Sequence, residues 1–97
     1  MVRYLDTPLN EPVAAQVMVT VSKKKFKRAV DRNRIKRLMR EAWRLQKVEL
    51  ENQLVADEKQ RAIVFIFVAS EMPNYEIVRD AMASLVQKML LTKPDQD

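Results

Sequence analysis

The stretch VSKKKFKRAVDRNRIKRLMREAWR, residues 21–44, carries most of the positive charge of this 97-residue chain. It holds eleven lysine and arginine side chains against two acids, Asp31 and Glu41, which gives it a net charge of +9. The rest of the chain has seven basic and eleven acidic residues, a net charge of −4. The protein is therefore a mildly acidic body with one strongly basic element, and this asymmetry predicts a polyanionic partner, nucleic acid first.

The length and composition predict a single domain over residues 1–97 with one modest core, since 47% of the residues are apolar. The longest apolar run, residues 62–69, is too short to span a bilayer, and the first ten residues lack the apolar segment of a signal peptide. Cysteine is absent, which excludes disulfides and thiolate metal sites. We therefore expect a cytoplasmic protein that does not bind membranes.

Histidine and glycine are absent as well. Without histidine the chain cannot form a Ser-His nucleophile system or a His-ligated metal site, and without glycine it has no Gly-rich phosphate loop. A carboxylate-only site is the one catalytic arrangement left open, but the acids fall singly or in surface-like pairs such as Asp57-Glu58. We expect no catalytic residue and no metal site in the protein, and we expect any chemistry to belong to its partner.

Two strands are predicted near the N-terminus. Residues 2–5 form a candidate strand, residues 6–12 have turn composition with Asn10 suited to a positive φ, and residues 13–22 alternate with a period of two. Two strands joined by a polar turn predict an antiparallel hairpin. The apolar run AIVFIFVA at residues 62–69 predicts a strand buried on both faces.

A helix is predicted to begin near Asp31, whose carboxylate makes it a good N-cap. A helical projection then gathers the apolar residues on one stripe: Ile35, Leu38, Met39 and Ala42. The opposite side gathers polar and basic residues: Arg32, Asn33, Lys36, Arg37, Arg40 and Arg44.

Three further residues of this helix carry separate expectations. Trp43 lies at the boundary of the two sides, so we expect it to be half in the core and half facing RNA. Arg37 and Glu41 are spaced for an i,i+4 ion pair. Arg34 points away from the main basic side, toward Glu41, and we expect it to help fix the loop or the fold.

The remaining chain predicts one more helix. The basic helix either continues through Leu54 or breaks into a loop before Asp57. Asn74 is expected to cap a final helix, and residues 92–97 are expected to fray. The core stripe of that helix is predicted to be Ile77, Val78, Ala81, Met82, Leu85, Val86 and Met89. The order of elements predicts an α+β fold, a small sandwich with helices packed on a sheet.

A basic helix side can also be an ordinary solvated surface, or an amphipathic element for anionic membranes or calmodulin. Like charges at i,i+4, such as Arg32–Lys36 and Lys36–Arg40, destabilise a free helix, so this density argues against an ordinary surface. Arginine outnumbers lysine on the helix, which suits bidentate phosphate contacts. The apolar stripe suits a protein core, so nucleic-acid binding is the favoured interpretation.

The segment RNRIKRLMRE at residues 32–41, preceded by VSKK at 21–24 and AV at 29–30, closely resembles the signature of the bacterial ribonuclease P protein component. The resemblance implies an α+β fold like domain 2 of ribosomal protein S5, with a left-handed βαβ crossover. It implies the accessory protein subunit of an endoribonuclease, a hydrolase that removes the 5′ leader from precursor tRNA. The implied partners are the ribonuclease P RNA subunit, which carries the Mg²⁺-dependent catalysis, and precursor tRNA, with no protein partner required.

The resemblance also places candidate RNA-binding residues. Nine fall on signature positions linked to RNA contact: Lys23, Lys24, Arg32, Asn33, Arg34, Lys36, Arg37, Arg40 and Arg44. The charge pattern adds Lys25, Lys27 and Arg28. Tyr4, Val19 and Phe65 are candidate contacts for leader bases, although a core role is the stronger interpretation of each. The alternative function is a generic basic RNA-binding module without a role in processing.

Two departures from the family pattern stand out. The family has a glycine in the loop before residue 29, where this chain has residues 25–28, KFKR. The family also begins with a further helix and strand that form one wall of a cleft for the single-stranded leader, whereas this chain starts inside the second family strand. Either Met1 is a late start or the protein lacks that wall.

Overall fold

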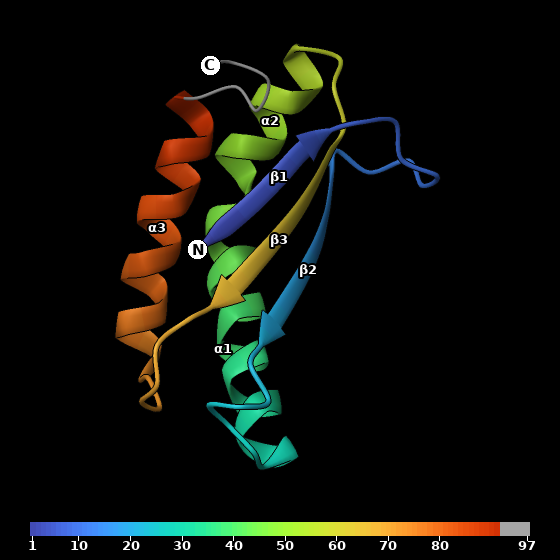
Figure 1. Cartoon of the computed structure of the whole chain (residues 1–97). Coiled ribbons are helices and arrows are strands. Elements are labelled where there is room, and N and C mark those ends of the chain that lie inside the picture. The colour runs from blue at the N-terminus through green and yellow to red at the C-terminus, as the bar shows by residue number, and fades with distance from the viewer. Residues whose placement is uncertain (92–97) are drawn as a thin grey trace.

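The computed structural model describes residues 1–91, and it contains a three-stranded sheet with three helices on one face (Figure 1). The strands are β1 (Val2–Asp6), β2 (Ala15–Val21) and β3 (Arg61–Phe67), and the helices are α1 (Ala29–Gln46), α2 (Val48–Ala56) and α3 (Tyr75–Leu91). This is an α+β fold, as the sequence predicts. Within the described part of the chain, no helix combines the length and the hydropathy that a membrane span requires.

The predicted hairpin is wrong, because β1 and β2 do not pair with each other. The strand order is β1-β3-β2, with β1 antiparallel and β2 parallel to β3. The β3 strand is the most apolar of the three, and the central position gives it a backbone partner on each edge. Residues 7–14 therefore carry the chain from one edge of the sheet to the other, and Asn10 does not adopt a positive φ.

The β2 and β3 strands are joined through α1 and α2 in a parallel βαβ unit. In Figure 1 the helices lie behind the sheet, both strands point downward, and β3 lies to the left of β2. This arrangement makes the crossover left-handed, against the strong general preference for right-handed crossovers. The handedness that the family resemblance implies is therefore present.

One face of the sheet packs on the helices and the other is open. Ile63 and Phe65 of β3 are 1% exposed, whereas Val64 and Ile66, which alternate with them, are only half-buried. The expectation that this strand is buried on both faces is therefore wrong. The cause is that all three helices cover the same face of the sheet (Figure 1).

The helix predictions hold best where the apolar spacing is local. Ile35, Met39 and Ala42 of α1 are buried, and Leu38 packs partly against the core. In α3 the buried residues are Val78, Met82, Val86 and Met89. Ile77 of the predicted stripe is 59% exposed and Ala81 is exposed too, because both border an open hollow between α3 and the end of β3.

The helix ends show how the chain terminates helices without glycine. Asn74 caps α3 as predicted, since its Oδ1 accepts a hydrogen bond from the Ile77 N–H at 2.9 Å. Helix α1 begins at Ala29, before Asp31, and its N-cap Arg28 makes no side-chain cap bond, so the predicted Asp31 cap is wrong. Helix α2 follows α1 after Lys47 alone and ends at Ala56. Just beyond its end, Glu58 has φ 55° and the Lys59 N–H donates to the Leu54 carbonyl. Glycine is the usual residue at such a left-handed position, so a glutamate there carries a conformational cost of about 1 kcal/mol.

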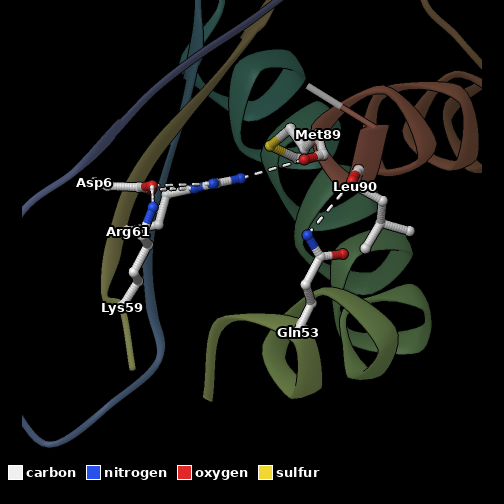
Figure 2. Close-up of polar contacts among 6 residues, drawn as sticks. All are labelled: Asp6, Gln53, Lys59, Arg61, Met89 and Leu90. Atoms are coloured by element: carbon white, nitrogen blue, oxygen red, sulfur yellow. Dashed lines mark hydrogen bonds and ion pairs between the residues drawn. The ribbon is translucent and has the colours of Figure 1, made fainter. Parts of the chain in front are cut away.

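A buried arginine joins β1 and β3 to α3 at one end of the sheet (Figure 2). Arg61 is 4% exposed and pairs with Asp6 on the neighbouring strand, with Nε 2.5 Å from Oδ1 and Nη2 3.3 Å from Oδ2. Its Nη1 lies 3.5 Å from the Met89 carbonyl, and its guanidinium lies 4.8 Å from the centre of the Tyr4 ring. A buried charge is tolerated only when it is paired and hydrogen-bonded, and these contacts meet that requirement.

We expect Asp6→Ala to lower the free energy of unfolding by about 3 kcal/mol, because it leaves the Arg61 charge buried without its anion. The measurement is urea unfolding at neutral pH. Asp80→Ala is the matched control, since its partner Arg79 and Asp80 itself are exposed and such pairs contribute about 1 kcal/mol or less. Equal losses in the two variants would contradict the role assigned to Arg61.

Candidate nucleic-acid interface

The basic surface is held in place by the opposite side of α1. Ile35 and Ala42 are fully buried, and Trp43 is 9% exposed with its ring centre 5.6 Å from that of Phe65. Trp43 therefore belongs to the core, and the expectation that it is half RNA-facing is wrong. At the start of the helix, Phe26 packs on Phe67 with ring centres 5.8 Å apart, which ties the lysine-rich loop to the end of β3.

Three of the eleven basic side chains of residues 21–44 are engaged within the described residues. Arg32 Nη1 donates to the carbonyls of Phe26 and Lys27 at 2.8 and 2.9 Å, so it fastens the loop before the helix. Lys25 Nζ donates to the Val68 carbonyl. Arg44 pairs with Glu41. The loop-fixing role expected of Arg34 thus falls to Arg32, while the Arg34 side chain is exposed and makes no such bond in residues 1–91.

The other eight basic side chains have no hydrogen bond or ion pair to residues of the described chain. They are Lys23, Lys24, Lys27, Arg28, Arg34, Lys36, Arg37 and Arg40. All are exposed except Lys36, which is half-buried. Asn33 is likewise exposed and unbonded among residues 1–91. So many unpaired cations along one helix and its preceding loop form a surface that can neutralise a run of phosphates.

A groove runs along the exposed side of α1. Its lining consists of Asn33, Arg37, Arg40, Glu41 and Arg44. Four of these residues recur at intervals of three or four positions, the spacing that places side chains on one side of a helix. The groove therefore brings together four of the six residues that the helical projection gathers, while Arg32 and Lys36 are half-buried beside it.

Glu41 is an anion within this cationic groove. The predicted pair with Arg37 is replaced by a pair with Arg44, in which Nη2 lies 2.7 Å from Oε1 and Nε lies 3.1 Å from Oε2. The hydrogen bonds from Arg44 lower the pKa of the Glu41 carboxyl, and the same bonds raise the pKa of Arg44. Because the folded-state pKa of Glu41 is depressed, the pair is intact at neutral pH and is lost only as the pH falls through that lowered pKa.

Arg40 connects the groove to the sheet. It also lines a second hollow on β2 and β3, beside Gln16, Met18 and Val64. Met18 is 64% exposed on the open face of the sheet. The alternation of residues 13–22 predicts that Met18 lies on the opposite face of the strand from Val17, Val19 and Val21. The candidate leader contact Val19 belongs to the inward-facing set, whereas Met18 belongs to the exposed one.

The three candidate leader contacts lie on the face of the sheet that packs on the helices. Val19 is 6% exposed and Phe65 is 1% exposed, so both have the core role that the sequence analysis favours. Tyr4 is half-buried on the same face, with its ring against the Arg61 guanidinium. No group of three or more acidic side chains that could hold a metal occurs within residues 1–91.

A protein-family model described as ribonuclease P matches residues 1–90, nearly the whole chain. The chain belongs to the ribonuclease P family. The family resemblance drawn from residues 32–41 is thereby confirmed.

Curated relatives carry the same family name. The ribonuclease P protein component of Porphyromonas gingivalis is 44% identical over 68 residues, which cover 70% of this chain and 50% of the relative. That of Chlorobaculum tepidum is 38% identical over 90 residues, covering 87% of this chain and 58% of the relative. That of Chlorobium phaeobacteroides is 34% identical over 87 residues, covering 82% and 60%. The chain thus spans half to three fifths of the length of these relatives, and no solved structure matches it.

We expect Arg37→Ala and Arg40→Ala each to weaken RNA binding and to reduce the slope of log affinity against log salt by about 1, because each removes one phosphate contact. Stability should change by about 0.5 kcal/mol or less, since both side chains are exposed and unpaired within the described chain. The measurement is RNA affinity at several salt concentrations, with circular dichroism for folding.

Lys88→Ala is the matched control, because Lys88 is an exposed cation on α3, outside the groove. It should leave the salt slope unchanged. If the α1 variants behave like Lys88→Ala, the groove is not the RNA surface, and if they lose their fold, this side of α1 is structural.

Proposed function

We propose that this chain is the protein subunit of ribonuclease P, and that it binds the catalytic RNA subunit and precursor tRNA during removal of the 5′ leader. The observation that carries the proposal is the exposed basic surface of α1 and its preceding loop, with eight side chains that have no partner within residues 1–91. Membership of the family and the names of the relatives support the same role.

The physical contribution of the protein would be electrostatic. Two RNAs that meet at a cleavage site repel each other through their phosphates, and divalent cations normally offset this repulsion. A rigid element with a net charge of +9 releases counterions from both RNAs on binding, and it therefore lowers the Mg²⁺ concentration that assembly requires. In this proposal Mg²⁺ serves the phosphodiester hydrolysis at the RNA and has no site on the protein.

The groove and the open face of the sheet would act on different parts of the substrate. Arg37 and Arg40 are placed to hold phosphates, and Arg40 reaches the edge of the hollow on β2 and β3. Exposed apolar residues on the open face of the sheet, such as Met18 of β2 and Leu5 of β1, are available to unpaired bases of a leader. Such contacts would distinguish precursor tRNA from mature tRNA.

The test is cleavage of precursor tRNA by the ribonuclease P RNA at a Mg²⁺ concentration where the RNA alone is slow. Addition of this chain is expected to raise the cleavage rate at least tenfold, and the double variant Arg37→Ala/Arg40→Ala is expected to lose most of that gain. Lys88→Ala should retain it. No gain from the unmodified chain would contradict the proposal.

Competition separates this function from a generic RNA-binding module. Unlabelled precursor tRNA should displace labelled precursor from the assembled complex better than mature tRNA does. Equal competition by the two tRNAs, together with no gain in cleavage, would instead indicate a generic module.

A further inference from the structure

Glu41 occupies a position that the electrostatics of phosphate binding disfavours. Of the two acids in residues 21–44, Asp31 lies in the first turn of α1, where the helix dipole stabilises a negative charge. Glu41 lies well beyond that turn and lines the groove with Arg37, Arg40 and Arg44. A groove built only to bind phosphates would gain one more contact from Arg44 if Glu41 were neutral.

Helix stability accounts for Glu41 only to a small extent. Its i,i+3 pair with Arg44 is solvent-exposed, with side-chain exposures of 45% for Glu41 and 61% for Arg44. Exposed pairs of this kind contribute little to stability. A functional role in the groove is the better explanation.

The geometry leaves Glu41 able to accept further hydrogen bonds. An ionised carboxylate has about four lone-pair positions, and the two bonds from Arg44 use one on each oxygen. Arg44 also fixes the orientation of the carboxylate, so its remaining lone pairs face a defined direction. The Glu41 carboxylate is ionised at neutral pH, as an ordinary glutamate is, and the hydrogen bonds from Arg44 lower its pKa further.

A ligand in the groove therefore meets two kinds of group. Arg37 and Arg40 attract phosphate oxygens, whereas the Glu41 carboxylate repels them and requires a donor. A ribose 2′-hydroxyl is such a donor, and it lies between successive phosphates of an RNA strand. DNA lacks this hydroxyl, so a DNA strand leaves the carboxylate without a partner close to its phosphates.

We propose that the groove of α1 is a ribonucleotide subsite, in which Glu41 accepts a hydrogen bond from a 2′-hydroxyl while Arg37 and Arg40 hold the neighbouring phosphates. The inference deepens the proposed function, on which it rests, by naming Glu41 as the residue that discriminates RNA from DNA. Arg44 is then a positioning residue that orients the carboxylate.

The test compares two probes of the same sequence, a hairpin RNA with a 5′ single-stranded extension and its all-deoxy counterpart. The unmodified chain is expected to prefer the RNA. Glu41→Ala should bind DNA more tightly than the unmodified chain does, whereas its affinity for RNA should rise much less. The ratio of RNA affinity to DNA affinity is therefore expected to fall about tenfold, the size expected for the loss of a hydrogen bond to a charged group. Glu41→Gln keeps an acceptor oxygen and should retain part of the preference.

Glu49→Ala is the matched control, because it removes the same charge from an exposed position on α2 outside the groove. It should leave the ratio unchanged. If Glu41→Ala raises both affinities by the same factor, Glu41 acts only through its net charge and the inference is wrong. A chain that binds the RNA and stimulates cleavage but has no preference over DNA would overturn this inference alone, whereas failure to stimulate cleavage would overturn the proposed function.

Discussion

The burial of one side of α1 against the sheet is the constraint on which the rest of this structure depends. The basic side chains on the exposed side of that helix repel one another, and each like-charge pair at i,i+4 lowers the stability of the helix by a few tenths of a kcal/mol. Ile35, Met39 and Trp43 on the buried side each contribute roughly 1.5–3 kcal/mol by leaving water. Burial is therefore several times larger than the repulsion, and it lets the chain display unpaired cations on a rigid element.

The same constraint organises the rest of the fold around the basic surface. Phe26 and Phe67 tie the lysine-rich loop to β3, and Arg32 fastens that loop to the start of the helix. At the far end of the sheet, the buried Arg61–Asp6 pair joins β1, β3 and α3. The charge on α1 is thus held in a fixed geometry, and a groove with defined hydrogen-bond partners can form along it.

The features of the fold that depend on local spacing could be predicted from the sequence, whereas the pairing of strands far apart in the chain could not. The buried residues Ile35, Met39 and Ala42 and the Asn74 cap follow from helical periodicity and backbone hydrogen bonding. The predicted pairing of the first two strands is wrong because nothing in residues 2–6 and 15–21 indicates that β3, about forty positions further along the chain, lies between them.

The side chains of the candidate site divide in the same way. Charge clustering was enough to find the basic surface, whose residues lie next to one another in the sequence. It could not show that Arg32 bonds the Phe26 carbonyl or that Glu41 selects Arg44 over Arg37, because rotamers and loop conformation decide these contacts. The sequence allows Val19 and Phe65 as RNA contacts, because alternation separates the two faces of a strand but does not show which face the helices cover.

The central claim is that this chain binds RNA through the many cations of α1 and its loop that have no partner among residues 1–91. The most direct measurement is the affinity of the unmodified chain for precursor tRNA as a function of monovalent salt concentration. Eight basic side chains have no partner among residues 1–91, and at roughly 0.7–0.9 counterions released per phosphate contact they predict a slope of log affinity against log salt between about −6 and −7. A slope shallower than about −2 would contradict the account.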